Sequence, residues 1–222
     1  MAEPTVLVDD AAADRAADLL ADLVRQAIAE RGRAAIAVSG GSTAPPMLDA
    51  LAAADDLDWD VVDVFQVDER VAPDGDPDRN ANQLARVPGR HHLMPVTDDD
   101  LEVAARRYAA ELPDRFDAVH LGMGPDGHTA SWPPGDPVID RTEPVAISGV
   151  YQGRVRMTLT PPVIDAARAR IVLITGEDKA DAIGRWLGGI GEAGGLPIDR
   201  ISLDDTTVVL DEPAAARLPE RS

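Results

Sequence analysis

The sequence predicts an α/β protein built on a mostly parallel β-sheet with helices on both faces. Short apolar runs alternate along the chain with segments of helical periodicity, the pattern of β-α-β units. The runs are continuously apolar, as expected of strands that are buried on both faces. The 222 residues are 45% hydrophobic but only 3% aromatic, so Ala, Val, Leu and Ile must fill the core.

The expected elements follow one another along the chain. Short apolar runs predict strands over residues 5–8, 34–39, 61–67, 116–122, 155–160 and 169–175. Helical spacing predicts helices from Asp9 or Asp10 to about Arg31, and over residues 45–54, 98–112 and 177–187. The glycine-rich stretch 187–197 is interpreted as a helix end and a surface loop. In such sheets ligands bind beyond the carboxyl ends of the strands, so the loops there are expected to carry the function.

Composition and charge narrow the class of protein. The net charge of −19 and the pI of about 4.4 argue against binding to nucleic acid or to an anionic membrane. The absence of cysteine excludes disulfides and thiolate metal sites. No leader pattern is present and no apolar run approaches ~20 residues, so we expect a single cytoplasmic domain over residues 1–222. Lys179 is the only lysine among 21 basic residues, which singles it out as a candidate ligand-binding cation.

The first candidate loop, Gly40-Gly41-Ser42-Thr43, lies between a predicted strand and a predicted helix. Glycines let backbone N–H groups approach a ligand, hydroxyls add donors, and a helix N-terminus favours an anion. The loop is therefore a candidate phosphate site, with an ordinary capped turn as the alternative. It has neither the spacing of a nucleotide P-loop nor the GxGxxG dinucleotide pattern.

The second candidate loop begins with Asp68, Glu69 and Arg70, directly after the strand predicted over residues 61–67. A carboxylate beside a guanidinium at a strand end can bind or activate a polar substrate. In so acidic a chain, a solvated charge cluster is the more frequent explanation of such a stretch taken alone.

The third candidate loop, residues 121–135, has the sequence LGMGPDGHTASWPPG. Histidine is the natural general base at neutral pH, and Asp126 is close enough in sequence to orient His128. The glycines of the loop leave room for a ligand. A capping aspartate beside an incidental histidine is the alternative, and these two side chains are too few to predict a metal site. No catalytic role is expected of the other histidines, His91, His92 and His120.

The fourth candidate region supplies cations. Arg154 and Arg156 alternate along the strand predicted over residues 155–160, so their side chains face one side. Lys179 lies near the start of a predicted helix, where a cation opposes the helix dipole unless an anion lies nearby. Lys179 is therefore a better candidate for a phosphate ligand than an ordinary surface lysine.

Taken together, these loops resemble those of the 6-phosphogluconolactonase family. The matching stretches are SGGST, VDERVAPDGDPDRN, LGMGPDGHTAS with the following PPG, and RMTLTPPVIDAARARIVLITGEDKA. They occur in the family's order and cover most of the chain from residue 36 to about 187. The third is the most specific, whereas the first and fourth are shared with glucosamine-6-phosphate deaminases and isomerases. The resemblance implies a Rossmann-like, mostly parallel sheet with a small subdomain.

The resemblance also implies the reaction, which is hydrolysis of 6-phospho-D-glucono-1,5-lactone to 6-phosphogluconate in the oxidative pentose phosphate pathway. It implies no cofactor and no metal, and we expect a monomer or homodimer. The residues expected to bind the phosphate are Gly40, Gly41, Ser42 and Thr43, with Arg156 and Lys179 as cationic partners. The sugar or lactone end is expected to be lined by Asp68, Arg70 and Asn80. His128 should be the general base and Asp126 its orienting partner.

The chain departs from the family pattern at two places. Trp132 and Pro133 stand where relatives often read TLFPG or SLFPG, so the site is expected to be unfamiliar there. Residues 148–153 lack the lysine of the usual SPKPP segment, and Arg154 is a candidate substitute.

Two other functions stay open at this point. An amino-sugar-phosphate deaminase or isomerase shares the Asp-Gly-His triplet, but this chain lacks the Asn-Glu-Pro segment that usually follows. A non-enzymatic sugar-phosphate sensor would need a DNA-binding domain of ~60 residues, for which the chain has no room and the wrong charge.

Overall fold

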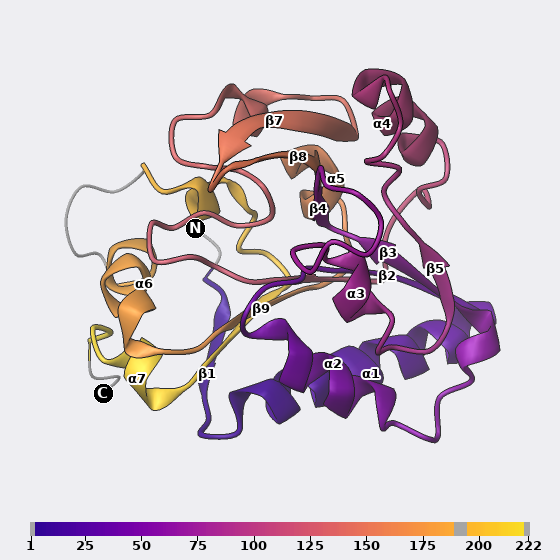
Figure 1. The fold of residues 1–222 in the computed structure, drawn as a ribbon. Helices are drawn as coiled ribbons and strands as arrows, with labels where there is room; N and C mark the ends of the chain where they lie inside the picture. Colours follow the sequence, from indigo (N-terminus) through magenta and orange to yellow (C-terminus); the bar gives the residue numbers. More distant parts are fainter. Residues whose placement is uncertain (1–2, 189–194, 220–222) are drawn as a thin grey trace.

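The fold is a central parallel sheet with a smaller antiparallel sheet above it (Figure 1). The computed structural model describes residues 3–188 and 195–219. The central sheet has the strand order β1-β10-β9-β6-β2-β3-β5, and all its pairs are parallel. Its strands are β1 Thr5–Val8, β2 Ala34–Val38, β3 Val62–Gln66, β5 Arg90–His92, β6 Ala118–Leu121, β9 Arg170–Ile174 and β10 Thr206–Leu210. The second sheet has the order β4-β8-β7 and consists of β4 Asp68–Arg70, β8 Arg154–Leu159 and β7 Val145–Tyr151.

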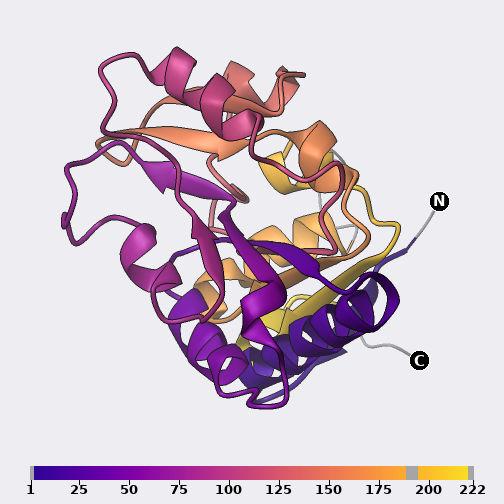
Figure 2. The same ribbon diagram turned by 90° about the vertical axis from the view of Figure 1, so that its right-hand side faces the viewer.

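Helices α1 and α2 cover one face of the central sheet, and α4 with the small sheet lies on the other side (Figures 1 and 2). The helices are α1 Ala12–Arg31, α2 Ala44–Ala52, α3 Ala81–Leu84, α4 Leu101–Ala109, α5 Pro161–Asp165, α6 Ala180–Trp186 and α7 Glu212–Ala215. Short 3₁₀ turns span Trp59–Val61, Pro137–Asp140, Glu177–Lys179 and Pro197–Arg200. In the part of the chain that the structure describes, no helix is both long and apolar enough to cross a bilayer.

Two apolar clusters hold the layers together. On the α1 and α2 face, small alanines of α1 let the helix approach the sheet closely, and Ile36, Val64 and Leu173 pack beneath it. On the other face, Met157 and Leu159 of the small sheet pack against the central strands in one continuous core. The small sheet is thus fixed to the central sheet by buried apolar contact.

The strand order creates a switch point between β2 and β6. From β2 the chain continues to β3 on one side, whereas β6 and β9 lie on the other side. The loops that follow β2, β6 and β9 therefore leave the same edge and diverge, and crevices of this kind bind ligands in α/β sheets. The small sheet covers this crevice because β4 follows β3 after a single residue, Val67.

The predicted parallel α/β architecture is confirmed, and several local expectations are corrected. The strand predicted over residues 155–160 belongs to the antiparallel sheet, and residues 68–70 form a strand instead of a loop. Helix α1 begins after Ala11, and Asp9 accepts a hydrogen bond from the Ala11 N–H without being the cap residue. The helix predicted over residues 177–187 starts as a 3₁₀ turn. Most of stretch 187–197 lies outside the described residues.

Candidate active site

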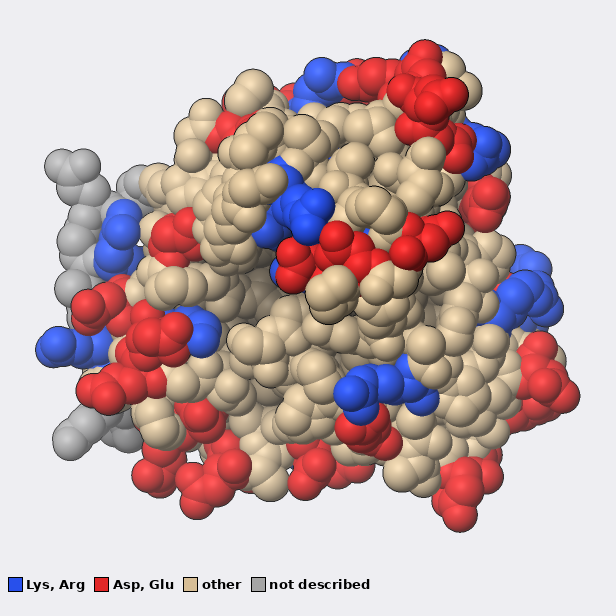
Figure 3. Space-filling view, viewed as in Figure 1, with Lys and Arg blue, Asp and Glu red and all other residues tan. Residues whose placement is uncertain are grey.

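A cavity of about 300 Å³ lies at the switch point, at the carboxyl edge of the central sheet. Figure 3 shows the hollow near the middle of this face, with basic side chains beside it and acidic ones around much of the surface. The cavity gathers the predicted site residues Gly40, Gly41, Ser42, Thr43, Asp68, Arg70, Asn80, His128, Arg156 and Lys179. Asp126, the remaining predicted residue, touches His128 without lining the cavity itself. The resemblance therefore selected side chains that four separate segments bring together.

His128 and Asp126 form a close pair in the loop after β6. The Asp126 carboxylate lies 2.5 Å from Nδ1 of His128 and also accepts the His128 backbone N–H at 3.2 Å. A turn closed by the Gly127 N–H and the Gly124 carbonyl, 3.0 Å apart, brings the two side chains together. No hydrogen bond in the described part of the chain involves Nε2, so this nitrogen is available to a ligand.

Gly124 is required by this geometry. A Cβ built at Gly124 would lie 2.0 Å from Cε1 of His128 and 3.0 Å from the Asp126 carboxylate. Any side chain there would displace the imidazole ring, because real Cβ atoms do not approach so closely. The glycine therefore lets the histidine ring approach the loop backbone closely.

The acidity of Asp126 is set by opposing effects. Burial acts to raise its pKa, but hydrogen bonds with Tyr151 and His128 outweigh burial and lower the pKa below its usual range. Asp126 is therefore ionised near neutral pH. Its carboxylate can accept a hydrogen bond from the protonated Nδ1 of His128. In that tautomer Nε2 carries the lone pair that a general base needs.

The glycine loop after β2 packs closely against Asn80 on one side and lines the cavity on the other. A Cβ on Gly40 would lie 2.2 Å from the Asn80 side-chain oxygen, so only glycine fits there. The Gly41 N–H donates to Gln83 at 3.0 Å, which fixes the loop to α3. Ser42 and Thr43 line the cavity at the start of α2, where a helix N-terminus favours an anion.

The register of the small sheet places two arginines side by side. Arg70 of β4 pairs directly with Arg156 of β8, so their side chains project from the same face. Like charges at such a position destabilise a sheet unless an anion offsets them. Asp68, two residues before Arg70, lies on the same face, and an anionic ligand in the cavity would supply negative charge beside the two arginines.

Adjacent carboxylates of β4 have different surroundings because side chains alternate along a strand. Burial raises the pKa of Asp68, while a hydrogen bond of 2.5 Å from Ser131 and the charges of Arg70 and Arg156 act to lower it. Glu69 points to the other side and accepts the backbone N–H groups of Asn80 and Ala81 at 2.7 and 2.9 Å. Glu69 therefore shapes the 69–81 loop, which is a structural role within the predicted charge cluster.

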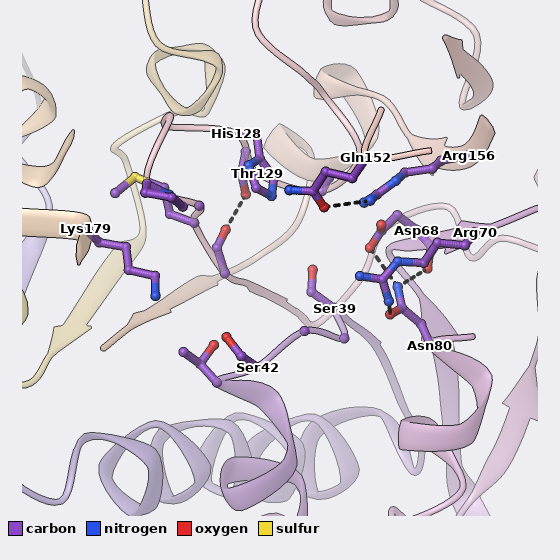
Figure 4. Close-up of a pocket in the computed structure, with 18 of the residues that line it drawn as sticks. Ser39, Ser42, Asp68, Arg70, Asn80, His128, Thr129, Gln152, Arg156 and Lys179 are labelled. Atoms are coloured by element: carbon purple, nitrogen blue, oxygen red, sulfur yellow. Dashed lines mark hydrogen bonds between the residues drawn. The ribbon is translucent and has the colours of Figure 1, made fainter. Parts of the chain in front are cut away.

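Lys179 and Arg156 lie at opposite sides of the cavity, with the glycine loop between them (Figure 4). Nζ of Lys179 lies 2.8 Å from the carboxylate of Asp178, which also lines the cavity. Arg156 donates to the Gln152 side chain at 3.1 Å, and its buried Nε has no partner in the described residues. The two cations thus flank the cavity as separate groups.

Two expectations about the departures from the family pattern are corrected. Arg154 does not replace the missing lysine in the cavity, because Asp76 and Asp78 hold its guanidinium at 3.0 and 3.3 Å in the neighbouring groove. Trp132 does not reach the cavity either. Its side chain is fully buried in the core, and its indole N–H donates to the Leu159 carbonyl at 2.9 Å.

Five polar side chains of the site were not predicted from the sequence: Ser39, Thr129, Tyr151, Gln152 and Asp178. Ser39 begins the SGGST stretch, and its buried hydroxyl has no partner among the described residues. Thr129 follows His128 and bonds to the Gly122 carbonyl at 2.8 Å. Tyr151 and Gln152 lie in the segment that departs from the family, so the family pattern gave no signal for them.

The other histidines lie away from the cavity, as expected. His120 is buried in β6, and burial lowers its pKa to about 4, so the ring is neutral. His91 and His92 lie on edge strand β5, where His92 contacts Asp63 at 2.9 Å. Within residues 3–188 and 195–219, no group of three or more histidine, cysteine or acidic side chains is arranged to hold a metal ion.

Comparison with known proteins agrees with the motifs. The family model described as glucosamine-6-phosphate isomerases/6-phosphogluconolactonase matches residues 8–210. A 6-phosphogluconolactonase of Streptomyces coelicolor is 37% identical over 93% of this chain and 90% of that protein. One of Mycobacterium leprae is 34% identical over 90% and 91%.

Solved structures show the same fold. The 6-phosphogluconolactonase from Thermotoga maritima superposes with a TM-score of 0.82 at 23% identity, covering 94% of this chain and 98% of that one. A monomeric glucosamine-6-phosphate deaminase gives a TM-score of 0.78 at 19% identity, covering 97% and 99%. The chain therefore belongs to the glucosamine-6-phosphate isomerase/6-phosphogluconolactonase family.

Proposed function

We propose that the protein is a lactone hydrolase that converts 6-phospho-D-glucono-1,5-lactone to 6-phospho-D-gluconate in the cytoplasmic oxidative pentose phosphate pathway. The observation that carries the proposal is the His128–Asp126 pair on the wall of a cavity that also holds the glycine loop, Lys179 and Arg156. A base and an anion-binding surface in one cavity are what hydrolysis of a phosphorylated lactone requires. The curated relatives at 37% and 34% identity carry this activity in their names.

His128 acts as the general base in this mechanism. Asp126 accepts a hydrogen bond from Nδ1–H of His128, so the unprotonated Nε2 removes a proton from water as the water oxygen attacks the lactone carbonyl. The C1–O bond to the ring oxygen then breaks, and protonated His128 returns the proton to that oxygen. A lactone is an activated ester, so the step needs no covalent nucleophile. Such a base contributes about 10²- to 10⁴-fold to the rate.

The phosphate lies against Gly40-Gly41-Ser42-Thr43 in the proposed complex. Ser42 and Thr43 offer donors at the start of α2, and Lys179 and Arg156 approach from the two sides. In a chain of net charge −19, this local basic surface is what overcomes general repulsion of a phosphate. A phosphate beside Lys179 would also offset the unfavourable interaction of this cation with the positive end of the helix dipole.

The lactone end lies toward Asp68, Arg70 and Asn80. The Arg70 guanidinium donates to the Asn80 side chain at 2.6 Å. This bond fixes one side of the guanidinium, and its other N–H groups are available to a ligand in the cavity. In this position Arg70 can stabilise the negative charge that develops on the carbonyl oxygen during attack. Loop N–H groups near His128 are the other source of such donors.

Activity toward enzymatically generated lactone tests the proposal. Purified protein should accelerate disappearance of 6-phosphogluconolactone above its spontaneous rate, with 6-phosphogluconate as product. Glucosamine-6-phosphate should release no ammonia, because no carboxylate occupies the position after Ser131 that the deaminases use. A spontaneous rate left unchanged by the protein, or ammonia release from the amino sugar, would reject the assignment. Tight binding of sugar phosphates without turnover would instead favour the sensor function.

A further inference from the structure

The geometry points to Tyr151 and Gln152 as a positioning pair, in which Tyr151 holds the Asp126–His128 pair and Gln152 holds Arg156. This inference rests on the proposed function for its kinetic consequences. The contacts that support it lie at the turn between β7 and β8 and at the bulge of β7. Neither residue belongs to the motifs on which the family resemblance depends.

The Tyr151 hydroxyl contacts both Asp126 and His128. It donates to Oδ2 of Asp126 at 2.6 Å and lies 3.0 Å from Nδ1 of His128. Burial and the bond to Asp126 raise the pKa of Tyr151 to about 12, so the hydroxyl keeps its proton. A side-chain donor thereby holds each oxygen of Asp126, which fixes the carboxylate plane against the imidazole.

Gln152 connects Tyr151 to Arg156. Its amide N–H donates to the Tyr151 hydroxyl at 3.3 Å, and its carbonyl accepts from Arg156 at 3.1 Å. The Arg156 guanidinium also lies 5.1 Å from the centre of the Tyr151 ring, within the range of a cation–π contact. One short turn therefore sets the positions of both the proposed base and a proposed anion ligand.

The backbone of the turn is specialised for this purpose. Gln152 has a φ of +49° and Gly153 a φ of +79°, as in two-residue hairpins of type I′. The left-handed conformation is unfavourable for a glutamine, and such strain persists where the surroundings enforce it. Glycine would be easier at position 152, but it would not reach Arg156.

A bulge in β7 selects which side chain faces the cavity. Ser148 pairs with Arg156 and Tyr151 with Arg154, so β7 has one residue more than β8 between these pairs. Without the extra residue, Val150 would stand opposite Arg154, and side chains would exchange faces. Val150 is instead 73% exposed, while Tyr151 faces the base.

The bulge is fixed by the loop that follows His128. The Gly149 N–H donates to the Asp136 carboxylate at 2.8 Å, and a Cβ on Gly149 would lie 2.8 Å from the same oxygen. Asp136 belongs to the loop after Trp132 and Pro133. The segment that lacks the family's lysine is therefore held by a residue just beyond Trp132 and Pro133, and this contact fixes the bulge that orients Tyr151.

Tyr151→Phe tests the Tyr151 half of the pair. It removes the hydroxyl and keeps the ring beside Arg156. Without that donor, Asp126 bears more negative charge and stabilises protonated His128, so the pH midpoint of His128 should rise. The other ionisable groups on this cavity, Asp68, Arg70, Arg156, Asp178 and Lys179, stay unchanged in the variant. We expect kcat to fall about tenfold or more at nearly constant KM, and the ascending limb of kcat/KM to move to higher pH.

Tyr108→Phe is the matched control, because Tyr108 is the only other tyrosine and its hydroxyl bonds to backbone away from the cavity. It should lower the melting temperature and leave the kinetic pH midpoint unchanged. Titration of His128 by NMR, assigned with His128→Ala, reports the same shift without substrate. Wild-type protein without lactonase activity would therefore reject the proposed function, while the NMR titration would still decide the role of Tyr151.

Gln152→Gly separates positioning from a structural role. Glycine relieves the left-handed backbone, so the melting temperature should stay equal or rise, whereas KM should increase severalfold as Arg156 loses its support. A merely structural role predicts that stability and activity change together. An unchanged His128 midpoint and kcat in Tyr151→Phe would overturn the Tyr151 half, and an unchanged KM in Gln152→Gly would overturn the Gln152 half.

Discussion

The two edges of the central sheet carry similar charged side chains in different arrangements. At the amino edge, Asp117 accepts Arg31 at 2.9 Å, Arg168 at 3.3 Å and the Ala35 N–H at 2.9 Å. At the carboxyl edge, Arg156 is held only by the neutral amide of Gln152 among its hydrogen-bond partners in the described chain. The amino-edge hollow is the larger, about 500 Å³ against 300 Å³. Arg156 is therefore left for an anionic ligand, whereas Arg31 and Arg168 already have a carboxylate partner, and the size of the hollow does not mark this difference.

The largest expected effect is that of His128→Ala. Removal of the base should lower kcat by about 10²- to 10⁴-fold, with a melting temperature close to that of the wild type because the ring lies at the cavity wall. Lactone hydrolysis and thermal unfolding would be measured side by side. His91→Ala, on the outermost strand β5 and away from the cavity, is the control and should keep full activity. Full activity in His128→Ala would reject the mechanism and leave the family assignment intact.

Paired arginine variants compare the two edges directly. Arg156→Gln should raise KM by about 10- to 100-fold, because it removes a charged contact to the anion. Arg168→Gln should leave KM unchanged and lower the free energy of unfolding by less than about 1 kcal/mol, as expected of an exposed ion pair. Steady-state kinetics and denaturant unfolding of both variants provide the measurement. Equal changes in KM would abolish the distinction between the edges.

Lys179→Ala should have a smaller effect on the same edge. The loss of one cation is expected to raise KM about tenfold with little change in kcat, since Lys179 lies away from Asp68 and Arg70 (Figure 4). Added salt should raise KM of the wild type more than that of the variant, because screening acts on the charge that the variant lacks. Lys179→Arg keeps the charge and should recover part of the affinity. An unchanged KM would remove Lys179 from the phosphate site.

The smallest expected effect concerns the pH dependence of stability. The pKa of Asp68 is raised in the folded protein because of burial, so its contribution to stability is present at low pH and is lost as pH rises through the folded pKa. Asp68→Asn carries no such charge, and its stability relative to the wild type should increase as pH rises above the usual aspartate range. Urea unfolding at several pH values would show this trend. If the difference in free energy of unfolding between Asp68→Asn and the wild type does not change with pH, ionisation of Asp68 does not destabilise the folded protein.

Much of the fold could be predicted because it depends on local patterns. The structure confirms, within a few residues, the strands predicted from the continuous apolar runs of β2, β3, β6 and β9. It also confirms the long helix α1, predicted from its helical spacing. Strands β4, β5, β7 and β10 were not predicted. β5 is a three-residue edge strand with the sequence Arg-His-His, and β7 is interrupted by Gly149, so neither has the apolar pattern of a buried strand. β10 is the apolar run TTVVL, which could have been recognised.

The part of the candidate site that could be predicted consists of residues that are close together in the sequence. Glycine loops, Asp126 before His128 and the isolated Lys179 can all be read from short stretches. The pairing of Arg70 with Arg156 depends on the register between strands some 85 residues apart in the chain, and no local pattern records it. The positions of Tyr151 and Gln152 depend on one extra residue in β7.

The sequence by itself determined the fold class, the switch-point loops and the identity of the histidine and its carboxylate, because each of these is fixed by residues that are neighbours in the chain. Only the tertiary structure decided which charges are left for a ligand. Arg154 and Arg156 are two residues apart on one strand face, yet Asp76 and Asp78 hold the first, and the second faces the cavity. Charge partners come from distant segments, and their approach is set by packing and strand register, which a linear pattern does not specify.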